Sequence, residues 1–150
     1  MTDSFDPKVL QDRSIYPVIV QENVRYRDTD GQKHVNNAVY ATYFEIGRGA
    51  ARRHATRHKS ALPESSTSVV VQQIINYHAQ IPALAVIEIG AGLIRIGRTS
   101  FVYGLGVFWQ DQCAASGQVT QVMLDRATGR PMPIPANYRA QLETILLRTP

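Results

Sequence analysis

The sequence predicts an α+β fold in which an antiparallel sheet lies over one long helix. A helical stripe of apolar residues occurs once, early in the chain, whereas residues 69–125 are almost wholly strand-like. The connections between these strand-like runs are short, and short connections join strands as antiparallel hairpins. The 150 residues are a common length for one domain, so we expect a single domain over residues 1–150.

The first strand and the long helix are expected on either side of a polar loop. Apolar and polar residues alternate over 18–27, whereas residues 1–16 show no sustained period and are expected to form a flexible lead-in. Turn-forming residues at 28–31 end the strand. The helix follows, with Asn36 or Asn37 as its candidate N-cap, because an asparagine side chain can accept an amide hydrogen of the first turn.

Four more strands and a short helix are expected after the long helix, whose pattern fades near His58. The strands are expected at about 69–79, 84–98, 101–109 and 113–125. In the second of these runs the apolar residues change parity, which predicts a bulge near residues 90–92. Pro135 can open a C-terminal helix from Ala136 to about Leu147.

Composition narrows the class of protein. An apolar fraction of 44% with 19% charged residues is typical of an ordinary soluble globular protein. The N-terminus lacks the basic flank and apolar run of a signal peptide, and no apolar run is long enough to cross a membrane. We therefore expect a cytoplasmic protein with no membrane partner. The lone cysteine, Cys113, has no internal disulfide partner and is expected to be a small packing residue.

The formal net charge of +4 permits an anionic partner. Arginine, lysine and histidine gather in the run 48–59, which is typical of a solvated helix face; the sharper alternative is a site for a phosphate-bearing ligand. No nucleic acid is expected, because the run has no interleaved aromatic residues. His54 and His58 are one helical turn apart, but no carboxylate motif lies near them, so no metal site is predicted.

The stretch 25–48 carries the candidate active site. Its loop delivers Asp30 and His34 directly before the helix that begins near Asn36 and Asn37. The N-terminus of a helix presents unpaired amide hydrogens and a partial positive charge. A carboxylate held beside it can attack a carbonyl group that these amides polarise.

Each of these residues also has a structural interpretation. Asp30 can cap the loop through nearby backbone amides, and His34 can either organise the loop or orient water or the carboxylate. Asn36 and Asn37 are expected to be caps. Asp28 is expected to be structural and serves as the internal comparison for Asp30.

A longer pattern runs through the same residues: Asp-Thr-Asp, three residues, His-Val-Asn-Asn, then a tyrosine and a Phe-Glu pair on the helix. Here it is Asp28-Thr29-Asp30, His34-Val35-Asn36-Asn37, Tyr40 and Phe44-Glu45. This pattern resembles that of the hotdog-fold thioesterases of the 4-hydroxybenzoyl-CoA thioesterase type. Residues 94–101 and 125–131 also resemble the later strands of that family, so the resemblance covers the chain from Val18 to Leu142.

The resemblance implies a hotdog fold, a five-stranded antiparallel sheet wrapped around the long helix, with acyl-CoA bound where two subunits meet. It also implies that Asp30 is the catalytic acid and that the amide of Asn37 polarises the thioester carbonyl, with His34 beside them. The expected substrate-binding residues are Asn36, Tyr40, Phe44, Arg95 and Arg98. The candidates for holding the CoA phosphates are Arg95, Arg98 and the helix face from Arg48 to Arg57, because a guanidinium fork offers two donors. The expected assembly is a homodimer or a dimer of dimers.

The chain departs from the family pattern at Lys33, where the family usually has glycine. A left-handed backbone is costly for a residue with a Cβ atom, so the loop is expected to differ in shape. Glu45 has two interpretations, as a lining residue of the acyl pocket or as a structural partner on the sheet.

The resemblance implies hydrolysis of an acyl-CoA thioester to the free acid and CoA, with Asp30 as either general base or nucleophile. This reaction requires only water, a carboxylate and a polarised carbonyl, so no cofactor is expected. One alternative is an acyl-CoA-binding module without catalysis. Another is a hotdog enoyl-CoA hydratase, but its loop has an Asn-Pro pair in place of Gln32-Lys33 and a histidine one residue later than His34. The sequence does not select the acyl group.

Overall fold

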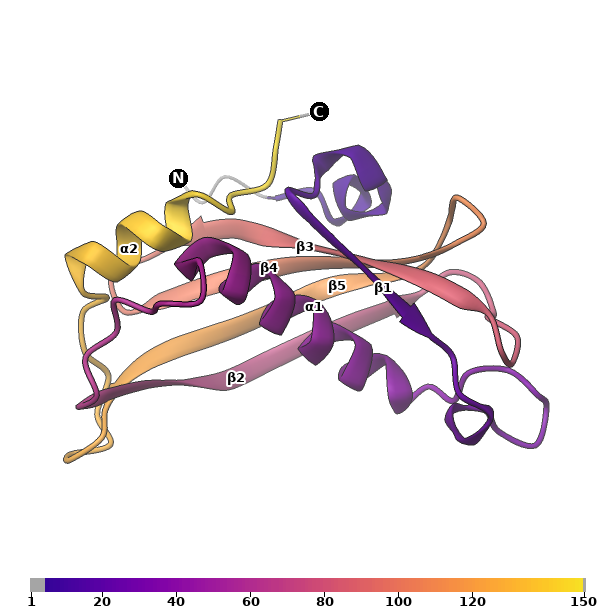
Figure 1. Ribbon diagram of the computed structural model, residues 1–150, viewed down its shortest axis with the longest axis horizontal. Helices are drawn as coiled ribbons and strands as arrows, with labels where there is room; N and C mark the ends of the chain where they lie inside the picture. Colours follow the sequence, from indigo (N-terminus) through magenta and orange to yellow (C-terminus); the bar gives the residue numbers. More distant parts are fainter. Residues whose placement is uncertain (1–4, 150) are drawn as a thin grey trace.

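The computed structural model describes residues 5–149 and shows five strands that form one sheet (Figure 1). The strands are β1 (Val18–Asn23), β2 (Ser66–Tyr77), β3 (Val86–Ile96), β4 (Ser100–Trp109) and β5 (Gln112–Asp125). Their order across the sheet is β1-β3-β4-β5-β2, and every neighbouring pair is antiparallel. The predicted α+β class and the five-stranded antiparallel sheet are confirmed.

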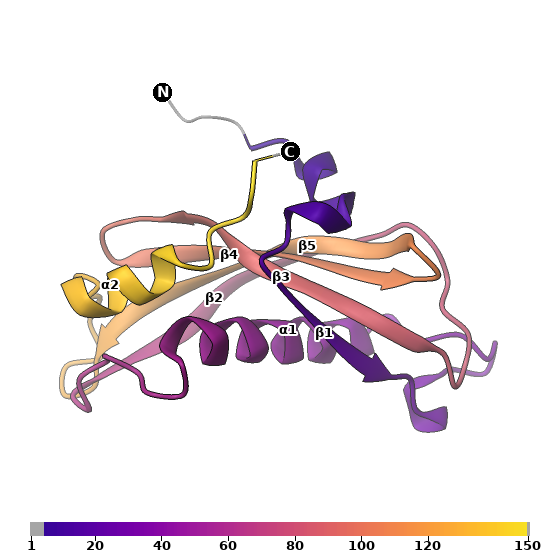
Figure 2. The ribbon, with the colours of Figure 1, turned by 45° about the horizontal axis from the view of Figure 1, so that its top comes forward.

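The long helix α1 (Val39–Thr56) lies along one face of the curved sheet (Figure 2). Its small residues allow a close approach. A Cβ atom at Gly47 would lie 2.7 Å from Ile89 Cγ2 and 2.9 Å from Leu105 Cδ2, which is closer than carbon atoms pack. A larger residue at this position would push α1 away from β3 and β4. The predicted central helix is therefore held by packing, although glycine lowers its intrinsic helix propensity.

The bulge in β3 lies beyond the place that the sequence predicted. The register between β3 and β4 runs evenly through Gly90 and Gly92 and shifts only between Leu93 and Arg95. Gly90 instead makes room for a neighbour, because a Cβ atom there would lie 2.5 Å from Tyr16 Cδ2. The bulge predicted for this strand is therefore present but lies directly after residues 90–92, and Gly90 marks a close approach of another segment.

Helix α2 (Ala136–Glu143) ends earlier than the predicted end at Leu147. The amide of Leu93 in β3 donates to the carbonyl of Ile145 over 2.7 Å, and the carbonyl of Leu93 accepts from the amide of Leu147 over 2.8 Å. These bonds occupy backbone groups that a longer helix would require, so the chain leaves the helix and runs along β3. Within residues 5–149, no helix has both the length and the apolar character needed to cross a membrane.

Residues 7–16 pack on the face of the sheet opposite α1 (Figure 2). Two short 3-10 turns, Pro7–Gln11 and Arg13–Ile15, carry them there. The buried cluster on this face consists of Leu10, Ile15, Tyr16, Phe108 and Cys113. The structure thus differs from the expected flexible lead-in over 1–16, because apolar side chains without a regular spacing are still buried. Residues 1–4 of that lead-in lie outside the described residues.

Strand β2 forms one edge of the sheet, and only β5 pairs with it. Most of its large apolar side chains are exposed; these are Val69, Val70, Val71, Ile74 and Tyr77. The opposite edge is β1, which is half as long and ends at Asn23 rather than at the expected Arg27. The sheet therefore has one long edge that is both unpaired and apolar.

Candidate active site

The loop between β1 and α1 closes on itself through backbone hydrogen bonds. The amide of Asp30 donates to the carbonyl of His34 over 2.9 Å, and the amide of Lys33 donates to the carbonyl of Asp30 over 3.0 Å. Lys33 adopts a φ angle of 64°, in the left-handed region. Lys33 therefore takes the conformation that favours glycine, despite the cost that the sequence predicts for a residue with a Cβ atom. The hydrogen bonds on both sides hold Lys33 in a conformation that is otherwise unfavourable.

A hollow of about 610 Å³ opens beside this loop and the start of α1. Four of the predicted site residues line it together: Asp30, His34, Asn37 and Tyr40. The volume lies within the range of ordinary ligand pockets. The structure therefore brings the predicted catalytic residues to one concave surface.

The carboxylate of Asp30 is exposed at the rim of the hollow. Its Oδ1 accepts a hydrogen bond of 2.8 Å from the amide of Gln32, which is the loop-capping contact expected from the structural interpretation. Within residues 5–149 no hydrogen bond engages Oδ2 of Asp30. One oxygen therefore fixes the orientation of the side chain, while the other remains available to water or a substrate.

Asp28, the internal comparison, has a different environment. Its side chain is buried, and its Oδ2 accepts from the amide of Arg25 over 2.8 Å and from the hydroxyl of Tyr43 over 3.4 Å. The guanidinium of Arg25 adds an ion pair at 3.2 Å. Burial opposes ionisation of Asp28, but the hydrogen bonds and charge of Arg25 outweigh it and lower the pKa of this carboxyl. Asp28 thus joins the loop to α1 as a structural group.

His34, Asn36 and Asn37 lie directly before the start of α1 and differ in their hydrogen-bond partners. The Nδ1 atom of His34 is buried, and no partner for it occurs within the described part of the chain. The side chain of Asn36 accepts from the amide of Ala38 over 3.0 Å, so Asn36 makes the predicted capping bond, although it lies outside the pocket lining. The amides of Asn36, Ala38 and Val39 each donate to an acceptor of the described chain, whereas that of Asn37 donates to none. The amide of Asn37 is therefore the free donor at this helix end.

Tyr40 and Phe44, predicted together, lie in different places. Tyr40 lines the hollow and packs edge-on against Tyr77 with ring centroids 5.2 Å apart. Burial, with a smaller effect of Tyr77, raises the pKa of Tyr40 to about 12, so its hydroxyl is neutral at physiological pH. Phe44 is completely buried in the core, where a Cβ atom on Gly117 would lie 2.8 Å from its ring. Phe44 packs α1 against the core and does not line the hollow.

Arg95 and Arg98 are exposed near the far end of β3 and the turn after it. Val86 begins β3 and pairs with Asn23, at the end of β1 from which the loop with Asp30 departs. Arg95 is nine residues further on, and a strand rises about 3.3 Å per residue, so Arg95 lies roughly 30 Å from Val86 along the strand. Within one protomer these arginines are therefore remote from Asp30. The arginines of α1 lie nearer to Asp30 than Arg95 and Arg98 do. Glu45 lines a second hollow, which is formed in part by the same helix.

The comparisons with known proteins agree with this geometry. The model of the thioesterase-like superfamily matches residues 8–142 of the chain. This protein belongs to that superfamily. No protein among those of curated function matches the chain.

Solved structures similar to this superfamily member include proteins from three bacteria. A thioesterase from Thermus thermophilus, determined with coenzyme A and zinc, is 31% identical, covers 85% of this chain and 98% of its own, and has a TM-score of 0.72. A predicted thioesterase from Bacillus stearothermophilus is 25% identical over 89% of this chain and all of its own, with a TM-score of 0.76. A protein from Pseudomonas aeruginosa is 26% identical over 90% of this chain and 95% of its own, with a TM-score of 0.77. The predicted hotdog thioesterase fold is confirmed.

Residues 77–80 also line the hollow and were not found as site residues from the sequence. Tyr77 ends β2, and His78 directly follows this strand, about forty residues after the loop. The hydroxyl of Tyr77 donates to the carbonyl of Asn37 over 3.1 Å, and Nε2 of His78 lies 2.8 Å from the hydroxyl of Ser116. Tyr77 was visible only as one apolar member of an alternating strand, and no motif marked His78. Among residues 5–149 no group of three or more His, Cys, Asp or Glu side chains is placed to hold a metal ion.

Proposed function

We propose that this protein hydrolyses acyl-CoA thioesters to the free acid and CoA. The observation that carries the proposal is that the exposed carboxylate of Asp30 and the free amide of Asn37 line one hollow. Membership of the thioesterase-like superfamily supports it, as does the coenzyme A bound to the similar Thermus thermophilus enzyme.

In the proposed mechanism, the thioester carbonyl oxygen accepts a hydrogen bond from the amide of Asn37. The partial positive charge at the start of α1 stabilises the negative charge that develops on this oxygen. As a general base, Asp30 removes a proton from water while the water oxygen attacks the carbonyl carbon. The C–S bond then breaks, and the thiolate of CoA leaves and takes up a proton. As a nucleophile, Asp30 would instead attack the carbonyl carbon itself, the C–S bond would break with departure of the CoA thiolate, and water would hydrolyse the resulting anhydride to the free acid and the Asp30 carboxylate.

Two neighbours assist this arrangement. His34 lies on the wall of the hollow beside Asp30, where its imidazole can orient the attacking water. Tyr77 holds the carbonyl of Asn37, so the peptide groups at the start of the helix have a defined orientation. A fixed donor stabilises a developing charge better than one that must reorient.

The test is an assay of thiol release from a panel of aromatic, short-chain and medium-chain acyl-CoA esters, together with a crotonyl-CoA hydration assay. The expected result is release of the CoA thiol at a rate proportional to the enzyme concentration. Binding of acyl-CoA without thiol release would favour the non-catalytic binding module. Hydration of crotonyl-CoA without thiol release would favour the hydratase.

The partner that the structure favours is a second copy of the chain, joined along β2. The unpaired edge of β2 is a template for another strand, and its exposed apolar side chains suit a protein interface. Because Tyr77 of this strand lines the hollow, pairing there would bring the partner subunit next to the site. A role for Arg95 and Arg98 in holding CoA phosphates would depend on such an assembly and stays a prediction.

A further inference from the structure

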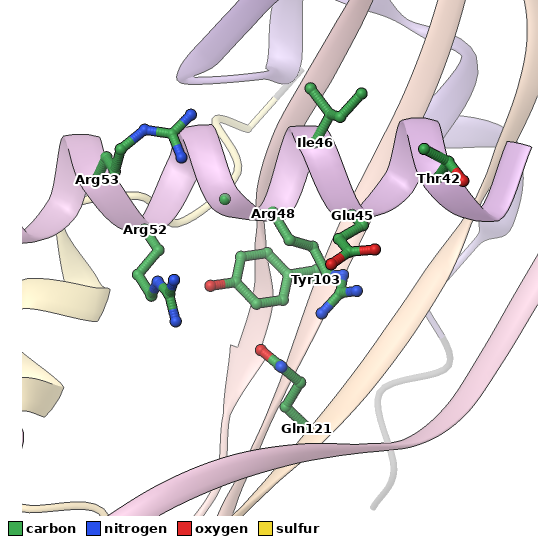
Figure 3. Close-up of a pocket in the computed structure, with 9 residues that line it drawn as sticks. Thr42, Glu45, Ile46, Arg48, Arg52, Arg53, Tyr103 and Gln121 are labelled. Atoms are coloured by element: carbon green, nitrogen blue, oxygen red, sulfur yellow. The ribbon is translucent and has the colours of Figure 1, made fainter.

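A second hollow, of about 440 Å³, lies further along α1 and gathers side chains that donate hydrogen bonds (Figure 3). Arg48 and Arg52 extend into it from the helix, and Tyr103 and Gln121 reach it from β4 and β5. We call it the arginine hollow. Arg53 lies at its rim and folds back toward Gly49, where a Cβ atom would lie 3.2 Å from Nη1 of Arg53.

The donors of the arginine hollow have no protein acceptors within residues 5–149. The Nε atom of Arg48 is buried and unpartnered. Neither Arg48 nor Arg52 forms an ion pair in this part of the chain, and no hydrogen bond engages the hydroxyl of Tyr103. A buried donor without an acceptor is costly, so the unpartnered Nε of Arg48 makes the hollow suited to an acceptor supplied from outside the chain.

The balance of charge in the arginine hollow favours an anion of low charge. The lining includes three guanidinium groups, of Arg48, Arg52 and Arg53, and a single carboxylate, that of Glu45; Arg48 and Arg52 lie on the side of α1 where Glu45 lies, and Arg53 points away from it (Figure 3). Glu45 would repel an incoming anion, and the neutral donors Tyr103 and Gln121 add no charge of their own. A carboxylate, with one negative charge and two acceptor oxygens, matches a guanidinium fork and costs less to desolvate than the several phosphate charges of CoA.

The two hollows lie on the same side of α1. Tyr77 of β2 lines the first, and Gln121, which lines the second, pairs with Val70 of the same strand. Asn37, whose amide is the proposed donor to the thioester carbonyl, and Arg48 are eleven residues apart, about 16 Å along the helix axis, and arginine side chains lean toward the N-terminus and shorten this gap. An extended chain advances roughly 3.5 Å for every three bonds, so about eight bonds span roughly 9 Å and the arginine side chain spans the rest.

We propose that the arginine hollow binds a carboxylate at the far end of the acyl chain, so that the preferred substrate is the CoA monothioester of a dicarboxylic acid of medium length. The inference rests on the proposed thioesterase function, because it takes the position of the thioester carbonyl from Asn37. A plain alkyl chain would leave the buried Nε of Arg48 without an acceptor.

The test compares suberoyl-CoA with octanoyl-CoA, which differ only in the terminal carboxylate. Dissociation constants of both esters and of CoA alone are measured by calorimetry on the Asp30→Asn variant. Suberoyl-CoA is expected to bind about tenfold more tightly or better than octanoyl-CoA, because hydrogen bonds to charged groups are the stronger ones. Tighter or equal binding of octanoyl-CoA would overturn the inference.

Arg52→Gln, made in the same background, should remove the preference and leave the affinity for octanoyl-CoA unchanged. The exposed Arg57, at the end of the same helix and outside both hollows, provides the matched control, and Arg57→Gln should keep the preference. If Arg52→Gln lowers the affinity for CoA alone and for both esters equally, the hollow holds CoA phosphates and the inference is wrong.

Because the readout is binding, a preference for suberoyl-CoA without any thiol release by the wild type would reject the proposed function alone. Efficient hydrolysis without that preference would reject only this inference.

Discussion

The hydroxyl of Tyr77 donates a hydrogen bond of 3.1 Å to the carbonyl oxygen of Asn37 and so connects edge strand β2 to the start of α1. This contact joins two segments that are forty residues apart at the residue whose amide is the proposed donor to the substrate. We expect Tyr77→Phe to lower kcat several-fold, because the peptide groups beside Asn37 lose their anchor. A single hydrogen bond contributes about 1 kcal/mol to stability, so the loss in the free energy of unfolding should be small. Steady-state kinetics and a thermal melt measure both effects.

Tyr26→Phe is the matched control for this prediction. Tyr26 is 77% exposed and lines none of the described hollows, so removal of its hydroxyl should change neither kcat nor Tm. Equal kinetic effects of the two substitutions would show that the contact between Tyr77 and Asn37 has no role in the reaction.

Asp30→Asn should abolish most of the hydrolysis while the protein remains folded. The amide side chain can still accept the hydrogen bond from Gln32, but it provides neither a base nor an anionic nucleophile. General-base assistance contributes typically 10²–10⁴-fold, so kcat should fall by at least about a hundredfold with little change in acyl-CoA binding. Turnover assays with a calorimetric binding measurement provide the check. A folded Asp30→Asn variant with nearly wild-type turnover would make Asp30 a purely structural residue.

Asp28→Asn should act mainly on stability. The buried carboxylate accepts hydrogen bonds from Arg25 and Tyr43, and bonds to a charged group contribute roughly 1.5–3 kcal/mol. Because the folded state lowers the pKa of Asp28, its contribution is complete above the pKa of the unfolded chain, about 3.9, and is lost as the pH falls through the folded value. Urea unfolding from pH 7 to pH 3 should therefore show a smaller acid-induced loss of stability in Asp28→Asn than in the wild type. Parallel pH profiles for the two proteins would contradict the assignment.

Lys33→Gly should raise stability without changing the loop. A residue with a Cβ atom in the left-handed region is strained by about 1–2 kcal/mol, while glycine loses about 0.5–1 kcal/mol more backbone entropy on folding. The net gain is expected to be up to about 1 kcal/mol, visible as a higher Tm. Lys33→Ala removes the charge but keeps the Cβ atom, so it should leave Tm near the wild-type value. A rise in Tm with alanine as large as with glycine would point to the charge rather than the backbone.

Ile74→Lys should weaken the proposed dimer. Ile74 is 44% exposed on the unpaired edge strand β2, and a lysine there would put like charges next to each other across a symmetric strand pair. Light scattering at micromolar concentration should show the wild type as a dimer or a dimer of dimers and the variant shifted toward the monomer. Val86→Lys, at an exposed apolar position outside β2, should leave the assembly intact. An active wild-type monomer would contradict the proposal.

Much of the fold was predictable because its signals are local. The alternation of apolar residues located the five strands, and the spacing of small residues in α1 located the buried face of the helix. Asp30, His34 and Asn37 were predictable as a group for the same reason, because a tight loop directly before a helix start keeps them together along the chain. The end of α2 was misplaced, since hydrogen bonds of Leu93 with the C-terminal segment outweigh the helical pattern.

The class of fold, the strand–loop–helix that carries Asp30 and Asn37, and the resemblance to thioesterases could all be predicted from the sequence. The other residues that reach the site are placed there by packing between distant segments. Pairing of β2 with β5 brings Tyr77 and His78 to the hollow, and packing of α1 on the sheet buries Phe44 and turns Arg48 toward Tyr103. The physical reason is that these positions depend on contacts between strands and helix that are distant in sequence, and no local spacing encodes them.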